Sequence, residues 1–479
     1  MNALMWSSLQ AFGFSLVLTP IFRDIFRSYK VVDQPDQNRK VHVQPIPRVG
    51  GIAIAVAYVL AFYFVRPSGQ TVSRELSLVA NILPSAGLMF ATGLVDDFFG
   101  LKPWQKLFGQ VIASSLAWWA GVRITGIAGN SVPELGGFLL TLGWLLVCTN
   151  AFNLVDGLDG LAAGVGLFAT LTMFTSAALK GNEPLMFATL PLAGCLLGFL
   201  CFNFNPATVF LGDCGSLLIG FLLGSFGVIW TDKSITLIGL TAPLMTLAVP
   251  LLDVLLCIIR RWLRHQPIFT ADRGHIHHKL LDRGLSPRQA VLLLYGLCGV
   301  AAVFSVLQTY VNDTYIAVGA VVVFVGVVWM GIHYLRYAEF MLAGQMLRTG
   351  EFQRSVNARM NLSSFEKSIA DAATLDDCWV AILKTRDTFG IAGIRMHAAG
   401  RTFASWDGEF DGPRFWTMRA PLSEHEYIEV AREFGSSVVP MVMVPFIELL
   451  VEALSDKLKN QESPAASAAK ASVLMQAGN

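Results

Sequence analysis

Long apolar runs recur along most of this chain, separated by short polar connections. They lie at about residues 3–22, 49–65, 77–95, 106–121, 136–151, 159–179, 184–202, 215–230, 234–252, 289–309 and 314–334. Apolar runs of roughly 20 residues can cross a bilayer as helices, because backbone groups in lipid must be hydrogen-bonded within their own segment. The pattern predicts an all-α polytopic membrane protein with about 11 transmembrane helices.

The composition supports the same class of protein. The 479 residues are 54% hydrophobic and 14% charged, whereas a soluble domain carries about 25% charge. The net charge of +1 gives no reason to expect nucleic-acid binding, and the seven cysteines include no CxxC pair that would indicate zinc. The first run is too long for a signal-peptide core, so we expect it to remain as a span.

The basic residues predict the orientation in the membrane. Lys and Arg are roughly threefold more frequent in alternate connections, chiefly residues 23–48, 102–106 and 260–288, than in the connections between them. Because positive residues stay on the cytoplasmic side, we expect the N-terminus outside and the C-terminus inside.

The composition changes near Leu335, so we expect a transmembrane domain over residues 1–335 and a small cytoplasmic α+β domain over residues 346–460. A helix is expected over 365–389, short strands over 391–406 around Ala398-Ala399-Gly400, and a closing helix over 444–459. The region faintly resembles a GAF-like regulatory domain, and a plain structural appendage is the alternative. The Ala/Ser-rich tail, residues 461–479, is predicted to be disordered.

Acidic residues gather at predicted span ends on the cytoplasmic side. Asp96 and Asp97 end the third run, and adjacent carboxylates at a membrane boundary are tolerated where a divalent cation or a proton relieves their repulsion. Asn153, Asp156 and Asp159 form a second cluster, in which the two carboxylates share one face if the segment is helical. Ordinary acidic helix ends and caps are the alternative for both clusters.

Two further clusters lie later in the chain. Asp213 precedes the eighth run, where it suits either a helix N-cap or a ligand of Mg²⁺, which prefers carboxylate oxygens. The long basic loop 260–288 contains His275, His277 and His278, but no Cys or fourth His lies nearby to complete a zinc site. Its basic residues favour an anion-binding surface over a neutral solvated loop.

With these motifs the chain resembles the polyprenyl-phosphate N-acetylhexosamine-1-phosphate transferases, the superfamily of MraY-type and WecA-like enzymes. The His-Ile-His-His form is closer to the WecA-like branch, since the MraY branch has three contiguous His. The resemblance covers about residues 1–335, in order. The matching motifs are Asp33-x-Pro35, Lys40-x-His42, Pro47-Arg48-x-Gly50-Gly51, Asp96-Asp97, Gln105-Lys106 with Gly109-Gln110, Asn153-x-x-Asp156-Gly-x-Asp159-Gly-Leu-Ala, Gly212-Asp213-x-Gly215-Ser216 and His275-Ile-His277-His278.

The resemblance implies a cytoplasmic active site in a bacterial inner (plasma) membrane. N-acetylhexosamine 1-phosphate, by default GlcNAc 1-phosphate, would pass from a UDP-N-acetylhexosamine to undecaprenyl phosphate with release of UMP, initiating a cell-surface glycan such as the O-antigen of lipopolysaccharide. The cofactor implied is Mg²⁺, with Mn²⁺ as the alternative, and the implied assembly is a homodimer in membrane lipid.

Roles for individual residues follow from the resemblance together with their chemistry. Catalytic roles are expected for Asp96, Asp97, Asp156 and Asp159, and metal binding for Asp213 and Asp97. An aspartate could deprotonate the lipid phosphate for direct attack, or Asp97 could form a covalent phospho-sugar, and the sequence leaves both open. Substrate binding is expected for Asn153, Lys106, Arg48, Arg273, His275, His277 and His278.

Two other functions fit part of the pattern. The segment from Asp156 to Ala163 matches the first half of the CDP-alcohol phosphatidyltransferase motif, but Gly164 replaces its Arg and the later paired aspartates are missing. A transporter or flippase with intramembrane carboxylates would place its acids near the bilayer midplane, often with repeat symmetry. Here the acids lie at one face and the sequence shows no internal repeat.

Overall fold

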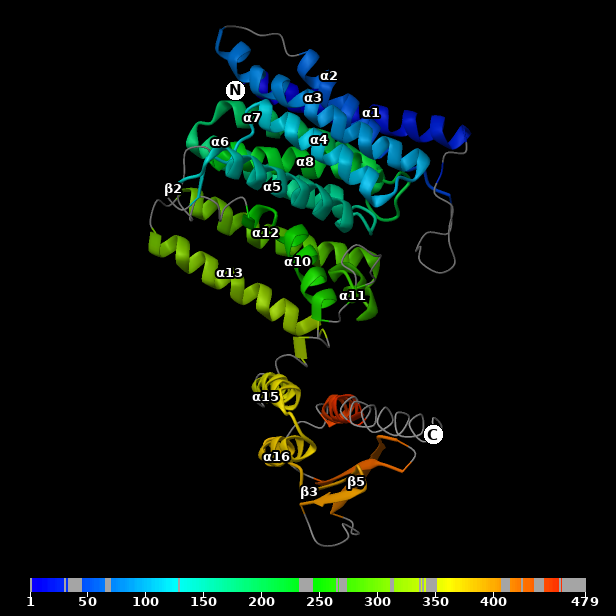
Figure 1. Ribbon diagram of the computed structural model, residues 1–479. Coiled ribbons are helices and arrows are strands. Elements are labelled where there is room, and N and C mark those ends of the chain that lie inside the picture. Colours follow the sequence, from blue (N-terminus) through cyan, green and yellow to red (C-terminus); the bar gives the residue numbers. More distant parts are fainter. Residues whose placement is uncertain are drawn as a thin grey trace, which may run out of the picture. The chain divides into compact units, whose positions relative to one another are not determined.

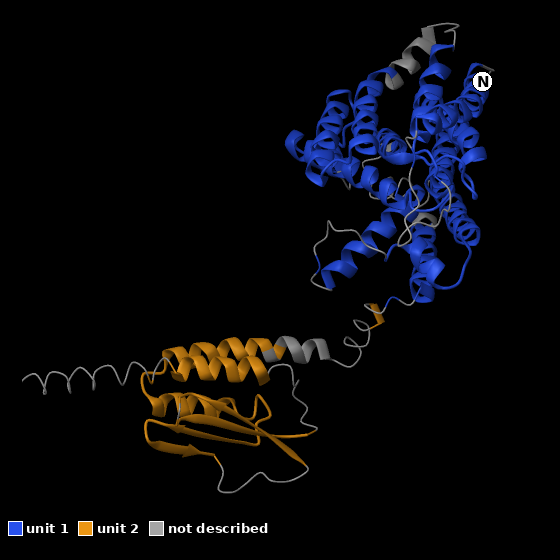
Figure 2. Cartoon of the chain, turned by 90° about the vertical axis from the view of Figure 1, so that its right-hand side faces the viewer, with its two compact units in different colours: residues 1–337 blue, residues 338–479 orange. Residues whose placement is uncertain are grey.

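The computed structural model divides the chain into two compact units, Met1–Tyr337 and Ala338–Asn479 (Figure 2). It describes residues 2–29, 32, 45–64, 70–127, 130–231, 244–263, 266, 274–310, 314–335, 337, 340–341, 351–405, 414–423, 425–434, 443–455 and 458.

The first unit is a bundle of helices with one small hairpin (Figure 1). Its elements are α1 (Asn2–Ser28), α2 (Gly50–Tyr63), α3 (Gln70–Phe99), α4 (Pro103–Trp119), β1 (Gly126–Ile127), β2 (Asn130–Ser131), α5 (Glu134–Val155), α6 (Leu161–Lys180), α7 (Glu183–Asn203), α8 (Gly212–Thr231), α10 (Ala248–Leu263), α11 (Ile276–Asp282), α12 (Pro287–Tyr310) and α13 (Thr314–Leu335).

Eight of the described helices are long and apolar enough to cross a membrane, and α2 is a shorter apolar helix. The predicted helical membrane class is confirmed. The count of about 11 spans stays a prediction, because residues 232–243, which belong to the expected span 234–252, lie outside the described part of the chain.

Small residues allow the helices of this unit to approach closely. A Cβ atom added at Gly198 of α7 would lie 2.8 Å from the carbonyl oxygen of Phe12 in α1. Nearby, the Ser15 hydroxyl donates to the Cys195 carbonyl at 2.7 Å. Between apolar helices in lipid, such close packing and polar contacts drive association, because the lipid tails are as apolar as the side chains.

Helix α8 lies at the centre of this packing. Of its apolar window, 89% is buried inside the protein, and it contacts α2, α3, α5, α6 and α7. Its buried length fixes the position of its N-terminal end, which begins at Gly212.

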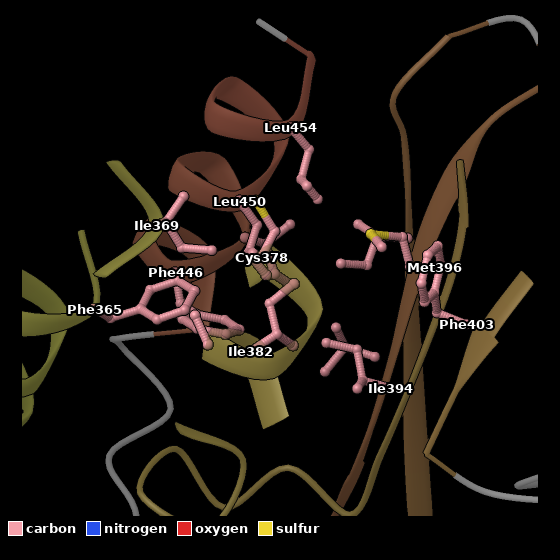
Figure 3. Packing of buried hydrophobic residues seen from close by; sticks show 14 of the residues in the cluster. Phe365, Ile369, Cys378, Ile382, Ile394, Met396, Phe403, Phe446, Leu450 and Leu454 are labelled. Carbon is pink, nitrogen blue, oxygen red and sulfur yellow. The ribbon is translucent and has the colours of Figure 1, made fainter. Parts of the chain in front are cut away.

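The second unit is a four-stranded antiparallel sheet covered on one face by helices. Helices α15 and α16 and a helix over residues 443–455 pack their apolar side chains against strands β3 and β4 (Figure 3). The sheet order is β4-β3-β6-β5. The bounds are α15 (Glu351–Asp371), α16 (Leu375–Thr385), β3 (Gly393–Ala398), β4 (Arg401–Ala404), β5 (Phe415–Pro421) and β6 (Tyr427–Glu433).

The sequence predicted only part of this unit. The hairpin at Ala399-Gly400 is present, and both residues have positive φ, 49° and 71°, as a two-residue hairpin turn requires. The single helix expected over 365–389 is wrong, because α15 ends at Asp371 and α16 starts after Thr374. Strands β5 and β6 were missed, although Trp416, Met418 and Ala420 alternate with polar residues at a strand period.

A capping box separates the two helices and gives a test of the second unit. The Thr374 hydroxyl accepts the Asp377 N–H at 3.1 Å, and Asp377 Oδ2 accepts the Thr374 N–H at 3.0 Å. We expect Thr374→Ala to destabilise this unit by about 1 kcal/mol, because an N-cap acceptor is lost. Pulse proteolysis of the full-length protein measures it. Ser368→Ala, which removes an exposed hydroxyl bonded only within α15, is the matched control, and equal stability of the two variants would contradict the capping role.

Candidate active site

A carboxylate from α3 holds the N-terminus of α8. The two oxygens of Asp97 accept the backbone N–H groups of Asp213 and Cys214 at 2.8 and 2.9 Å. The first N–H groups of a helix have no partner within it, so both the hydrogen bonds and the helix dipole stabilise a carboxylate there. Gly93 permits the approach, since a Cβ atom on it would lie 2.5 Å from the Asp213 carbonyl oxygen. Asp97 thereby fixes the position of Asp213.

Lys106 joins three polar side chains beside this junction. Its Nζ lies 2.9 Å from Asp96 Oδ2 and 3.1 Å from Asn153 Oδ1, and it forms an ion pair with Asp213 Oδ2. Asn153 also donates its Nδ2 to Asp213 Oδ1 at 2.9 Å. The sequence predicted that a divalent cation or a proton relieves the repulsion between Asp96 and Asp97. In the structure, the Lys106 ammonium pairs with Asp96, and the backbone N–H groups at the start of α8 donate to Asp97.

Asp156 and Asp159 lie in the turn between α5 and α6, so the shared helical face considered for them does not exist. Asp159 Oδ2 accepts the Asn205 Nδ2 and the Ala207 N–H, both at 3.0 Å. In the same region the Gly160 N–H donates to Asn203 Oδ1 at 3.1 Å. Asp159 therefore ties this turn to the loop that precedes α8.

Asp156 belongs to the same electrostatic cluster. Burial raises its pKa to about 8, the nearby carboxylates of Asp213 and Asp97 add to the rise, and Arg48 opposes it. Arg48 lies just before α2, and its backbone bridges Phe210 in the loop that leads to α8. Burial is the main cause of this rise, and a bound cation would relieve the smaller part that the neighbouring carboxylates contribute.

The histidines lie in a packed structure rather than on the open basic loop that the sequence indicated. His275 and His277 are buried, and α11 begins at Ile276. Their rings are parallel, with centroids 5.8 Å apart. Burial and the neighbouring His278 lower the pKa of His277 to about 4, so its ring is neutral at pH 7. Arg273 lies outside the described residues.

The structure brings His277 to the turn that carries Asp156. A Cβ atom added at Gly157 would collide with the His277 imidazole, so only glycine fits there without a shift of the ring. One residue of this region was missed from the sequence: Asp253, a lone carboxylate in apolar α10, contacts His275. Its isolation in an apolar helix was the signal that could have found it.

The cluster can recognise phosphate and hold a hard cation. Lys106 supplies a partly buried positive charge, and the side chains of Asp96, Asp213 and Asn153 place oxygen atoms around it. Within the described ranges, no group of three His, Cys, Asp or Glu side chains is arranged to hold a metal ion alone. Mg²⁺ characteristically takes one or two carboxylates and completes its shell with water and substrate phosphates, so the donor set fits that ion.

Comparisons with known proteins point to one family. The model for glycosyl transferase family 4 matches residues 79–231, from α3 to the end of α8. A Bacillus subtilis protein named as a probable undecaprenyl-phosphate N-acetylglucosaminyl 1-phosphate transferase is 35% identical over 325 residues, 66% of this chain and 87% of its own length.

Two more relatives carry the names of related phospho-sugar transferases. A decaprenyl-phosphate N-acetylglucosaminephosphotransferase of Mycolicibacterium smegmatis is 35% identical over 56% of this chain and 72% of its own. A phospho-N-acetylmuramoyl-pentapeptide-transferase of Latilactobacillus sakei is 30% identical over 55% of this chain and 87% of its own.

The contact between α3 and α8 gives a direct test of the site geometry. We expect Gly93→Ala to destabilise the protein by about 1–3 kcal/mol, because the added methyl meets backbone atoms and cannot be relieved by a rotamer change. Amide hydrogen exchange at Asp213 and Cys214 should accelerate. Gly87→Ala on the same helix, where a Cβ atom meets nothing within 4 Å, is the control. Equal exchange in the two variants would show that Gly93 is not required for the approach.

Proposed function

This chain belongs to glycosyl transferase family 4, and from that premise we propose that it transfers N-acetylglucosamine 1-phosphate from UDP-N-acetylglucosamine to undecaprenyl phosphate, releasing UMP. The reaction would initiate a cell-surface glycan at the cytoplasmic face of a bacterial inner membrane. The names of the relatives support a polyprenyl-phosphate acceptor and disfavour the transporter alternative.

One observation of the site carries this proposal: Lys106 is held among Asp96, Asp213 and Asn153 at the ends of four different helices. A partly buried lysine next to carboxylates suits a substrate that brings phosphates and a divalent ion together. The Lys106 ammonium would recognise a phosphate as a point charge, without the planar specificity of arginine.

The chemistry follows from two bonds. An oxygen of the lipid phosphate bonds to the β-phosphorus of the UDP-sugar, and the bond from that phosphorus to the bridging oxygen breaks, so the bridging oxygen leaves with UMP. Lys106 and Arg48 would stabilise the charge that develops on the phosphate oxygens. Asp213 would hold Mg²⁺, and the nearby charge of Asp156 would favour its binding. The bound ion would neutralise charge on the leaving group.

The contacts of Asp97 support direct attack over a covalent intermediate. Both of its oxygens accept backbone N–H groups from α8. A phospho-sugar on Asp97 would be an acyl phosphate, which would remove the carboxylate charge and take one of the two oxygens that accept N–H groups at the start of α8. Asp97 therefore positions Asp213, and Asp96 is the carboxylate that would accept a proton from the lipid phosphate.

The first experiment measures UMP release by the purified full-length protein. Undecaprenyl phosphate, Mg²⁺ and a panel of UDP-GlcNAc, UDP-GalNAc and UDP-glucose are supplied, with EDTA and lipid-free controls. We expect UMP from UDP-GlcNAc only when both lipid and metal are present, because the acceptor and the cation each complete the site. If folded protein releases UMP from none of the UDP-sugars, the proposed function is refuted. If it prefers UDP-GalNAc, the assignment of UDP-GlcNAc as the donor is refuted.

A second experiment tests the acidic pair. We expect Asp97→Asn to lower kcat by at least about 100-fold, because an amide supplies one acceptor oxygen where two N–H groups need partners, so the alignment of Asp213 is lost. Asp24→Asn, which changes an exposed carboxylate of α1 paired with Arg23, is the matched control. A soluble, folded Asp97→Asn protein with more than half of the wild-type kcat would remove Asp97 from the mechanism.

A further inference from the structure

Helix α10 holds the start of α11 with two buried side chains. Asp253 and Arg260 are seven residues apart, so they lie on the same face of the helix. They are 2% and 5% exposed, in a helix that is otherwise mostly apolar. Asp253 contacts the backbone and side chain at residues 275–276, and the Arg260 Nη1 donates to the Gly274 carbonyl at 2.9 Å.

The Asp253 carboxylate makes two distinct contacts. Its Oδ1 accepts the Ile276 N–H at 2.7 Å, which caps the first turn of α11, and its Oδ2 lies 2.9 Å from the Nδ1 of His275. A carboxylate can only accept, so the imidazole must carry its proton on Nδ1. The Nε2 of His275 is then the acceptor nitrogen of the neutral ring.

The ring of His275 is linked by packing to the turn at Asp156. It stacks in parallel on His277, and the His277 imidazole lies against Gly157. Helix α10 also packs against α5, the helix that carries Asn153. Movement of the Asp253 carboxylate would therefore change the orientation of His275 relative to the carboxylate cluster.

We propose that Asp253 is a positioning residue for the transfer reaction: it fixes the tautomer and orientation of His275, so that Nε2, the acceptor nitrogen of that tautomer, meets a hydroxyl group of the substrate's sugar. This inference rests on the proposed function. A carboxylate that orients a functional imidazole through its second nitrogen is a general device, and its loss typically costs about 10–100-fold in activity.

The test is a double-mutant cycle in the full-length protein, with UMP release as the readout. Asp253→Asn keeps an acceptor oxygen for Ile276 but turns an NH₂ group toward Nδ1, which enforces the wrong tautomer. His275→Asn keeps an N–H for the Asp253 carboxylate but lacks Nε2. Each variant is expected to lower kcat by about 10–100-fold. The double variant is expected to be no more than about threefold below the worse single one, because both changes remove the same function.

The control is Asp282→Asn, also on α11, whose 66% exposed carboxylate lies 3.8 Å from Lys279; we expect its kcat to equal that of the wild type. Asp253→Asn with a kcat within twofold of the wild type would overturn the proposal. Losses that multiply in the double variant would also overturn it, since Asp253 would then act independently of His275. If Asp253→Asn does not fold, Asp253→Glu keeps the charge but displaces the carboxylate, and wild-type turnover from it would overturn the proposal.

Hydrogen exchange separates this inference from the proposed reaction. Exchange of the Ile276 amide is expected to be at least about tenfold faster in Asp253→Ala than in the wild type, because its acceptor is removed. This measurement needs no turnover. Equal exchange in the two proteins would refute the contact between Asp253 and the Ile276 N–H. Absence of UMP release from the wild type would refute the proposed function and leave this contact unaffected.

Discussion

The contact on which the first unit depends is the acceptance of two α8 backbone N–H groups by Asp97. It places a charge at the end of an apolar bundle, where an unpaired carboxylate would be costly. The helix start provides hydrogen bonds and a favourable dipole, and Lys106 balances the adjacent Asp96. Helix α8 is the most buried of the candidate spans. A shift of its first turn would therefore displace the helices that pack around it.

The polar cluster follows from the alternation of helix direction. The C-terminal ends of α3 and α5 and the N-terminal ends of α4 and α8 contribute Asp96, Asn153, Lys106 and Asp213, which touch one another. Antiparallel neighbours bring these ends to one side, so residues from about 96 to 213 in the sequence meet in one place. The N-terminal helix ends supply unpaired N–H groups, which suit carboxylates and phosphates alike.

The sequence predicted that acids at the ends of apolar runs would gather, because such acids are costly unless they have partners. It could not predict what those partners are. The pairing of Lys106 with Asp213 spans 107 residues, and that of Asp97 with the α8 backbone spans 116. Local periodicity carries no information at such separations. Asp253 was missed because motif spacing does not detect a single carboxylate, although its place in an apolar helix was a signal. The partner of His275 lies in α10, 22 residues earlier in the chain.

Three carboxylates of this unit use one physical device. Asp97, Asp159 and Asp253 each accept a backbone N–H from a segment 116, 48 and 23 residues away. Each therefore fixes a distant stretch of backbone as well as carrying a charge. Loss of activity after replacement of such an acid does not by itself identify it as a group that touches the substrate, because displacement of the backbone it holds gives the same result. The distinction rests on variants that keep the backbone acceptor and change only the second contact, and Asp253, with one oxygen on a backbone N–H and the other on an imidazole, is the carboxylate of the three that allows it.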